Sequence, residues 1–326
     1  MEVNSKLKEY IQDNILSKYD NIYSVDGIER IEYVLKRSEE IINENNLDVD
    51  YDLLYTAICY HDIRVDNNEE NHELSSANYM FNDEQLRQFL NKEQLETIKK
   101  AIEDQRANLG GEPRNIYGKI LSSASRNTTI GQCFERAYKY GKSHNPDATE
   151  EEIFEKAYEA LNNKFGQNGY AKFYFQDPTY ERFLFNIRNL LSDKNNFIKK
   201  HKEYIQNGGP IEHIHSIIII KKDDKFLNYY DERWDTYFFP NIKGNNIDEI
   251  KEQYNVNEVK LLFDKVHEKY SVPHNEVRTY HHYFYEIDSD VEGEYYTLDD
   301  LLTLKNVKKN NNDIIDFLQE YYKSNA

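Results

Sequence analysis

The sequence has few of the residues that a disulfide framework or a thiolate metal site requires. Among its 326 residues there are only 2 cysteines, Cys59 and Cys133, far apart and without a CxxC partner. This usage disfavours both a disulfide scaffold and a zinc site built from thiolates. The chain also begins with an amphipathic stretch rather than an apolar signal segment. We therefore expect a cytoplasmic protein.

Long hydrophobic runs are absent as well. No stretch approaches the roughly 18 apolar residues that a membrane span requires, so we expect no membrane association. Hydrophobic residues still make up 39% of the chain and aromatic residues 14%, with 28 tyrosines. This supply is enough for folded cores.

Positive charge is in short supply. The chain has 41 Lys and Arg against 59 Asp and Glu, a formal net charge of -18. Its short basic runs, at residues 198–202 and 220–225, suit a solvated surface. Because general binding to nucleic acid or to an anionic membrane needs clustered cations, we expect neither.

The length exceeds the usual size of one hydrophobic core, so we expect two domains, residues 1–205 and 206–326. In the first, apolar residues step by three and four, as in 26–42, which predicts an all-helical domain. Asp26 and Thr149 are expected to cap helices, and Glu112-Pro113 to occupy the first turn of another. Further helices are expected over 50–61, 84–90, 93–105, 112–125 and 149–165.

Gly208, Gly209 and Pro210 mark the predicted boundary between the domains. Beyond them the pattern favours a mixed α+β domain, with Asp223-Asp224 as a two-residue turn between strands. Strands are expected over 214–222, 225–230, 236–242, 276–287 and 294–298, and helices over 257–270 and 312–324.

Several motifs of the first domain follow one another in a characteristic order. They are "GIERIEYVLKRS", "AICYHDIR", "NHELSSA", "AIEDQRA", "EPRNIYGKI" and "SSASRN". In this order they resemble the HD superfamily of metal-dependent phosphohydrolases, and more narrowly its small bacterial members of unassigned substrate. With the later strings "CFERAYKY" and "KFGQNGYAKFYF", the resemblance covers nearly all of residues 1–205.

The resemblance implies a site in which two histidines and two aspartates hold a divalent metal that activates water. This chain keeps His61 and Asp62 but has Arg30 and Ser125 at the other two positions. Gln105 replaces a further histidine. A guanidinium stays protonated and cannot ligate a cation. We therefore expect no metal cofactor, and we expect Arg30 to occupy the place of the metal and to pair with Asp62.

Other retained polar residues allow two interpretations each. His72 matches a position near the substrate or a second metal, but it also suits a structural helix start. Arg106, Arg114 and Arg126 could grip a phosphate or form salt bridges. With Arg30, Gln105 and Ser125 they complete the expected ligand-binding set. The acidic run at 66–70 offers Asp66, Glu69 and Glu70 as substitute metal ligands, although a polar loop is the simpler interpretation.

The order of elements in the second domain resembles a Nudix domain. That resemblance implies a glycine-led helix whose Arg-Glu and Glu-Glu pairs gather magnesium. Aligned with the helix expected over 257–270, only Glu268 stands at a metal-binding position, while Lys265 and Lys269 would repel the ion. This domain is therefore also expected to be catalytically empty.

Four histidines of the second domain could form a zinc site, but a structural role is the simpler interpretation because no third ligand is placed beside them. Their strands place His213 and His215 on one face, and His281 and His282 on opposite faces. The aromatic stripe Tyr280, Tyr283, Phe284 and Tyr285 is expected to pack the sheet, with a base-stacking pocket as the alternative. Trp234, next to Arg233, fits either interpretation.

Three hypotheses for function follow. The first is a pseudoenzyme that binds or senses a nucleotide or another phosphorylated small molecule. The second is a residual phosphohydrolase that uses His61, Asp62 and His72 with manganese or magnesium. The third is a structural or protein-interaction module, with homo-oligomer formation as one form.

Overall fold

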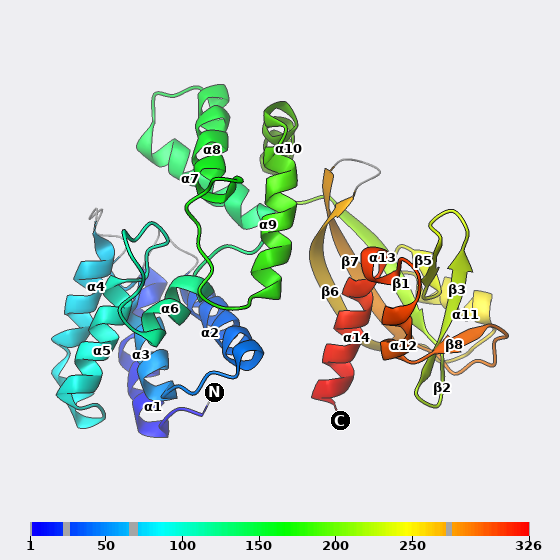
Figure 1. The fold of residues 1–326 in the computed structure, drawn as a ribbon, viewed down its shortest axis with the longest axis horizontal. Helices are drawn as coiled ribbons and strands as arrows, with labels where there is room; N and C mark the ends of the chain where they lie inside the picture. The colour runs from blue at the N-terminus through cyan, green and yellow to red at the C-terminus, as the bar shows by residue number, and fades with distance from the viewer. Residues whose placement is uncertain (1, 22–26, 65–70, 272–275, 326) are drawn as a thin grey trace. The chain divides into compact units, whose positions relative to one another are not determined.

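The chain folds into two units, a helical one over residues 1–202 and a mixed one of strands and helices over residues 203–326 (Figure 1). The computed structural model describes residues 2–21, 27–64, 71–271 and 276–325. The helical N-terminal region and the mixed C-terminal region agree with the two fold classes that the sequence predicts.

The first part of the helical unit encloses one apolar core. Buried faces of its helices meet there, including Ile31 and Val34 of one helix and Leu54 and Ile58 of another. The elements are α1 (Ser5–Asn14), the 3-10 helix η1 (Leu16–Asn21), α2 (Gly27–Asn45), α3 (Tyr51–Tyr60), α4 (His72–Phe81), the 3-10 helix η3 (Glu84–Gln88), α5 (Lys92–Glu103) and α6 (Ile116–Ala124).

The remaining helices of this unit pack through aromatic rings. The elements are α7 (Ile130–His144), α8 (Glu150–Phe165), α9 (Pro178–Leu191) and α10 (Lys194–Asn207). His201 of α10 stacks on the Phe134 ring, with 4.4 Å between the ring centres, and its Nε2 donates a hydrogen bond to the Phe134 main-chain oxygen. Burial lowers the pKa of His201 to about 4, so it is a neutral core residue.

Capping residues decide where these helices begin, and they correct one expectation. Thr149 forms the predicted cap, as part of a capping box with Glu152. The placement of Glu112-Pro113 in a first turn is wrong, because α6 begins at Ile116, where the Asn115 side chain accepts a hydrogen bond from the Gly118 amide. Residues 84–88 form a 3-10 helix, and Asp26 lies outside the described residues.

The C-terminal unit contains two sheets. One has the order β5-β1-β7-β6, with β1 and β7 parallel and the other pairs antiparallel; β3 of the second pairs with β2, β4 and β8. The strands are β1 (Glu212–Ile219), β2 (Lys221–Lys222), β3 (Lys225–Asp231), β4 (Thr236–Phe238), β5 (Asn241–Lys243), β6 (Lys260–Ser271), β7 (Glu276–Glu286) and β8 (Glu294–Tyr296). Asp223-Asp224 forms the predicted turn between β2 and β3.

The prediction of a helix over 257–270 is wrong, because most of this segment forms the strand β6. Its apolar residues Leu262, Val266 and Tyr270 recur every fourth residue. This spacing places them on one face of a helix, and also on one face of a strand, so it does not distinguish the two. Antiparallel pairing with β7 from Lys260 to Ser271 decides in favour of the strand. This unit does contain a helix just before that segment: α11 (Ile247–Tyr254) lies between β5 and β6.

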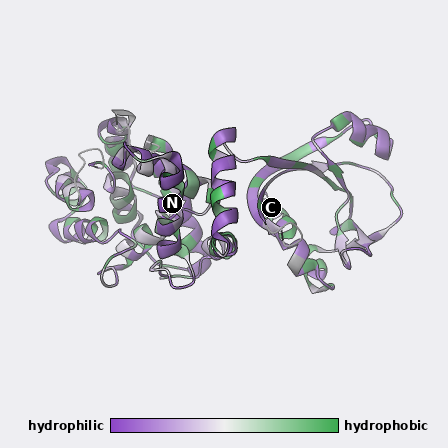
Figure 2. Ribbon diagram, turned by 90° about the horizontal axis from the view of Figure 1, so that it is seen from above, coloured by the Kyte–Doolittle hydropathy of each residue, from purple (hydrophilic) through white to green (hydrophobic). Residues whose placement is uncertain are grey.

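Short C-terminal helices cover one face of the first sheet. They are α12 (Leu298–Thr303), α13 (Val307–Asn310) and α14 (Asn312–Ser324). Ile314, Ile315 and Leu318 of α14 share a core with Phe284 of β7, and Figure 2 shows the strands curving around the C-terminal helix. Tyr285, the next residue of β7, belongs to a second core on the opposite face. The aromatic stripe therefore packs the sheet on both sides.

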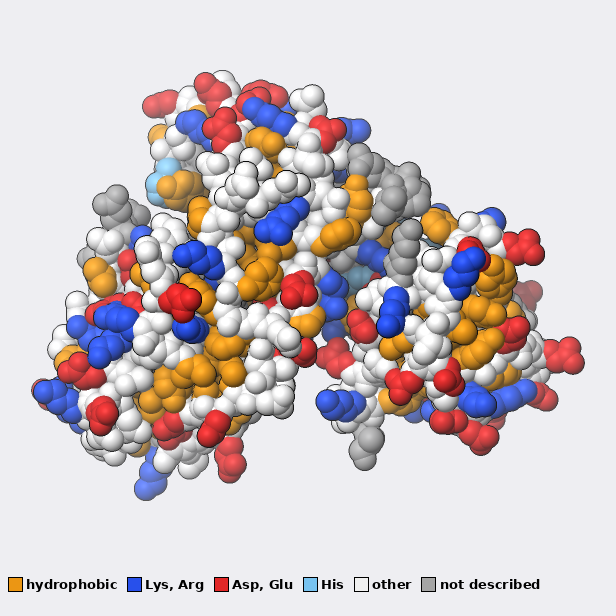
Figure 3. All heavy atoms as spheres, in the orientation of Figure 1, with side chains coloured by type: hydrophobic (Ala, Val, Ile, Leu, Met, Phe, Trp, Pro, Cys, Tyr) orange, Lys and Arg blue, Asp and Glu red, His pale blue; other side chains and the backbone are white. Residues whose placement is uncertain are grey.

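On the face drawn in Figure 3, Lys and Arg side chains are scattered among Asp and Glu side chains on both units. Across the described residues, no helix is both long and apolar enough to cross a membrane.

A buried ion pair joins α2 to the start of α9. Nη2 of Arg37 lies 2.6 Å from both carboxylate oxygens of Asp177, and both residues are buried. Asp177 also caps α9, because its side chain accepts a hydrogen bond from the Tyr180 amide. One aspartate thus balances a buried charge and satisfies a helix end.

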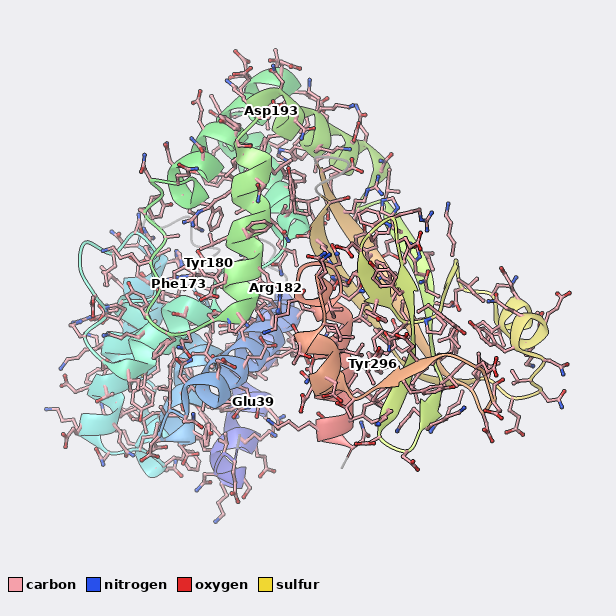
Figure 4. All side chains as sticks on the ribbon, turned by 45° about the vertical axis from the view of Figure 1, so that its right-hand side comes forward. Glu39, Phe173, Tyr180, Arg182, Asp193 and Tyr296 are labelled. Atoms are coloured by element: carbon pink, nitrogen blue, oxygen red, sulfur yellow. The ribbon has the colours of Figure 1, made fainter. Side chains whose placement is uncertain are left out.

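We expect Asp177→Ala to lower the free energy of unfolding by about 3 kcal/mol, because it leaves the Arg37 charge buried with less compensation. Asp177→Asn should cost less, since it keeps the cap. The control is Asp193→Ala at the start of α10 (Figure 4), where an exposed aspartate accepts a hydrogen bond from the Asn196 amide. Its loss should cost about 1 kcal/mol. Urea unfolding followed by circular dichroism would measure these values, and equal costs for the two alanine variants would contradict the prediction.

Candidate functional site

The His61-Asp62 pair lies inside the helical unit because α3 is buried from Leu53 to its last residue, Tyr60. Residues 53–60 are all buried, so the end of this helix lies within the core rather than at the surface. His61 is fully buried and follows the last residue of α3, and Asp62 is 9% exposed. The buried helix therefore places the polar side chains of His61 and Asp62 in the interior of the unit.

Both ring nitrogens of His61 face oxygen atoms. Nδ1 lies 2.6 Å from the Ile58 main-chain oxygen, and Nε2 lies 3.0 Å from Oδ2 of Asp62. Gln105 holds the same turn, because its Nε2 donates to the His61 main-chain oxygen at 2.8 Å. The imidazole is thereby fixed against its neighbouring carboxylate.

Arg30 and Ser125 contact one another. Arg30 of α2 is buried, and its Nη2 donates a hydrogen bond to the main-chain oxygen of Ser125 at the end of α6. Its guanidinium carbon also lies 5.5 Å from the centre of the Tyr33 ring. The tertiary structure thus brings together residues that are 95 positions apart in the sequence.

Asp62 is held in its ionised form by its surroundings. Burial alone would raise the pKa of Asp62, but His61, His72 and the charge of Arg30 together hold it well below its ordinary value. The nearer nitrogen of His72 lies 3.5 Å from Oδ1 of Asp62. Positive and polar neighbours therefore take over the compensation that a bound cation would give.

One edge of this site reaches solvent. The side chains of His72 and Arg106 are 26% and 33% exposed. Arg106 is oriented by Glu73, with 2.7 Å between its Nε and the carboxylate, and its Nη2 lies 3.5 Å from Nδ1 of His72. We refer to Arg30, His61, Asp62, His72, Gln105, Arg106 and Ser125 as the remnant cluster.

Two of the expected ligand-binding arginines are committed elsewhere. Arg114 makes hydrogen bonds of 2.8 to 3.1 Å to Asp104 and one of 2.6 Å to Glu103, and these partners raise the pKa of its guanidinium. Arg126 donates to the main-chain oxygens of Ser122 and Lys172. Its guanidinium also lies 5.2 Å from the ring of Tyr180, which packs against Phe173 (Figure 4). Arg114 thus forms the salt bridges that the sequence allows, whereas Arg126 donates to main-chain oxygens; ligand binding by either residue stays a prediction.

The residues present do not fit the metal that the resemblance implies. His61 and Asp62 could supply two ligands, but Arg30 is a cation and the serine at position 125 offers no carboxylate. Within the described ranges, no group of three or more His, Cys, Asp and Glu side chains could hold a metal ion. Asp66, Glu69 and Glu70 lie outside those ranges.

In the C-terminal unit, Glu268 lies on a strand rather than on the expected helix. It pairs in register with Thr279 of β7. Lys265 and Lys269 point toward α14, where they lie 3.5 Å from Glu320 and 2.8 Å from Asp313. These lysines dock the C-terminal helix, so their role is structural.

The helix α11 was missed in the sequence, although its start carries a clear signal. Asn246 caps it by accepting hydrogen bonds from the Asp248 and Glu249 amides, and Gly244 precedes it with a φ of +92°. Two residue pairs, Asp248-Glu249 and Glu252-Gln253, stand one turn apart on this helix. Gly-Asn-Asn followed by Ile-Asp-Glu is the capping pattern that would have identified it.

His281 and His282 lie on opposite faces of β7, as the alternation predicts. His281 lies between two carboxylates, 3.1 Å from Glu212 and 2.8 Å from Asp264. His282 lies 3.1 Å from His267, on the face that α14 covers. His215 of β1 is its ring neighbour at 6.0 Å, whereas His213 packs near Tyr280. Neighbouring histidines therefore have contrasting surroundings.

No protein-family model and no curated protein sequence matches the chain. Among solved structures, a C. elegans Ap4A hydrolase aligns with 36% of this chain and 99% of its own, at 12% identity and a TM-score of 0.28. A UDP-X diphosphatase aligns with 54% of this chain and 94% of its own, at 14% identity and a TM-score of 0.27. At these values the alignments do not establish a shared function.

We expect His281 and His282 to change stability with pH in opposite directions. Burial lowers the pKa of His282 to about 3, so its contribution is present above pH 6.5 and is lost as the pH falls toward 3. Although burial opposes it, Asp264 and Glu212 raise the pKa of His281. The contribution of His281 is therefore complete below pH 6.5 and is lost as the pH rises through its folded value.

Urea unfolding of the full chain at several pH values, followed by the fluorescence of Trp234, the single tryptophan, would measure how the free energy of unfolding depends on pH. His282→Asn should flatten the loss of stability in acid, and His281→Gln should weaken the protein more at pH 5 than at pH 8. Parallel pH profiles for the two variants would contradict these assignments.

Proposed function

We propose that this protein is a pseudoenzyme that binds or senses a phosphorylated small molecule, with nucleotides included in that class. Its helical unit would be an HD-like domain (residues 1–205) whose metal has been replaced by a fixed cation, and residues 206–326 would be a Nudix-like domain. The observation that supports this most strongly is the buried guanidinium of Arg30, hydrogen-bonded to the main chain of Ser125.

The charges of the site support the replacement. Two neutral histidines, two carboxylates and one divalent ion would sum to zero, and so do Asp62 and Arg30. A guanidinium cannot coordinate a water molecule, so it cannot lower the pKa of that water as a metal ion does. The substituted site would therefore keep a balanced charge but could not activate water for hydrolysis.

The solvent-reaching edge of the remnant cluster supplies a place for the ligand. His72 and Arg106 are both nitrogen donors, and a guanidinium can hold two phosphate oxygens at once. Arg30 adds positive charge behind them. We infer that a phosphate group would lie against this edge, with Glu73 holding the Arg106 guanidinium in position.

The C-terminal unit supports the same conclusion once α11 is taken as the helix of the Nudix-like pattern. Each expected pair keeps one glutamate, Glu249 and Glu252. Asp248 stands where the pattern has arginine, and Gln253 stands where it has a second glutamate. Two carboxylates with no third described partner make a poor magnesium site, so this unit would also act in binding.

The double variant Arg30→His with Ser125→Asp should restore tight uptake of Mn²⁺, because it returns the two missing ligands to a preserved scaffold. Metal analysis after dialysis would measure it, with about one ion per chain expected. Adding Asp62→Ala should abolish the uptake, and Arg30→His alone should bind weakly. A stoichiometric ion in the unsubstituted protein, with phosphatase turnover that Asp62→Ala removes, would instead support a working hydrolase.

A panel of nucleotides and other phosphorylated compounds should include one that stabilises the full chain. A ligand at a hundred times its Kd stabilises by about 2.7 kcal/mol, which a thermal unfolding experiment detects. Arg106→Gln should abolish the shift, whereas Arg87→Gln, an exposed control in η3, should leave it unchanged. If no compound shifts the Tm, a structural or interaction role, including homo-oligomer formation, is favoured.

A further inference from the structure

A second polar cavity lies in the helical unit, apart from the remnant cluster. Its volume is about 700 Å³, which lies in the range that small-molecule sites occupy. No member of the remnant cluster lines it. Its lining residues are Tyr10, Lys18, Arg64, Ser75, Asn78, Tyr79, Asn82, Asp83 and Glu84.

Two positive side chains converge on one ring of this cavity. The guanidinium carbon of Arg64 lies 4.5 Å from the centre of the Tyr79 ring, and the ammonium nitrogen of Lys18 lies 5.1 Å from it. Lys18 also donates a hydrogen bond to the Tyr79 hydroxyl. Among the described residues, neither cation forms an ion pair with a carboxylate. Two like charges at one ring repel each other, and a bound anion would relieve that repulsion.

The main chain holds both cations in place. The Arg64 amide donates to the hydroxyl of the buried Ser76 in α4 at 3.2 Å. Tyr19, the residue after Lys18, donates its hydroxyl to the Cys59 main-chain oxygen at 2.9 Å, which ties η1 to α3. Main-chain and neighbouring hydrogen bonds therefore fix the segments that carry Lys18 and Arg64, and the two exposed side chains meet at the Tyr79 ring.

The carboxylate of Asp83 forms no ion pair with Lys18 or Arg64 among the described contacts, and its two oxygens accept hydrogen bonds from other groups. Its Oδ2 accepts hydrogen bonds from the hydroxyls of Tyr10 and Tyr60, at 2.7 and 2.6 Å. Its Oδ1 accepts the Gln85 amide at 3.1 Å. Asp83 thus closes one wall of the cavity as a hydrogen-bonded structural group.

The rest of the lining suits hydroxyl groups rather than a planar base. Ser75, Asn78 and Tyr79 lie on α4 and Asn82 caps its end, at spacings that place Ser75, Tyr79 and Asn82 along one face, and Glu84 also lines the cavity. Amides and carboxylates at this spacing can read several hydroxyls. The aromatic rings are already engaged, since Tyr79 carries the two cations and Tyr10 packs on Phe89 at 5.9 Å. These contacts favour a ligand that binds through hydroxyl groups over one that stacks a base on these rings.

We propose that this cavity binds a phosphorylated polyol, such as a sugar phosphate. Lys18 and Arg64 hold the phosphate over the Tyr79 ring, and Asn78, Asn82 and Glu84 hold the hydroxyls. The site is independent of the proposed function, because it shares no residue with the remnant cluster.

Calorimetric titration of the full chain tests this with four probes: inorganic phosphate, ribose, ribose 5-phosphate and AMP. Ribose 5-phosphate should bind at least tenfold more tightly than phosphate, and ribose should not bind. Arg64→Gln and Lys18→Gln should each weaken ribose 5-phosphate at least tenfold. Asn78→Ala should weaken ribose 5-phosphate but not phosphate, which separates hydroxyl recognition from charge. Arg87→Gln is the control and should bind as the unsubstituted chain does.

The changed side chains are exposed, so an unchanged Tm should accompany each variant. No binding of ribose 5-phosphate, or equal binding by Arg64→Gln, would overturn the proposal. AMP binding more tightly than ribose 5-phosphate, in an Arg64-dependent way, would overturn the polyol class. Loss of binding in Arg106→Gln but not in Arg64→Gln would move the anion to the remnant cluster, and would support the proposed function while this inference fails.

Discussion

A buried carboxylate sets the main constraint on the helical unit. Asp62 lies just beyond the end of α3, which is buried from Leu53 onward, and only 9% of the residue is exposed to solvent. A buried charge must be compensated or neutralised. Here His61, His72 and Arg30 keep it ionised, and the remaining members of the remnant cluster fix those partners in place. The position of α2 against α6 follows from the same requirement, because Arg30 also satisfies the main chain at Ser125.

The turn that follows α3 contributes three residues to two different sites. His61 and Asp62 belong to the remnant cluster, whereas Arg64 lines the separate cavity beside Tyr79. The turn that follows α3 changes the direction of the chain, so side chains two residues apart serve different surroundings.

In the C-terminal unit, charged side chains lie near histidines on both faces of the strand β7. His281 lies between carboxylates on one face, and His282 lies under α14 on the other. On the covered face, Lys269 and His267 lie near Asp313, which gives the C-terminal helix a polar attachment beside its apolar core. Burial raises the pKa of Asp313, but Lys269 and His267 lower it below its ordinary value.

Local patterns in the sequence determined the helical half, the capping of α8, the turn at Asp223-Asp224 and the strand β7, because each depends on residues near one another in the chain. The sequence also identified Arg30 and Ser125 as departures from the expected ligand set. Only the tertiary structure decided that these two residues touch, that Arg114 and Arg126 bind elsewhere, and that β6 is a strand. Its apolar spacing suits either element, and pairing with β7 supplies the free energy that distinguishes them. Contacts between distant segments leave no periodic trace in the sequence, so these choices are made only when the chain folds.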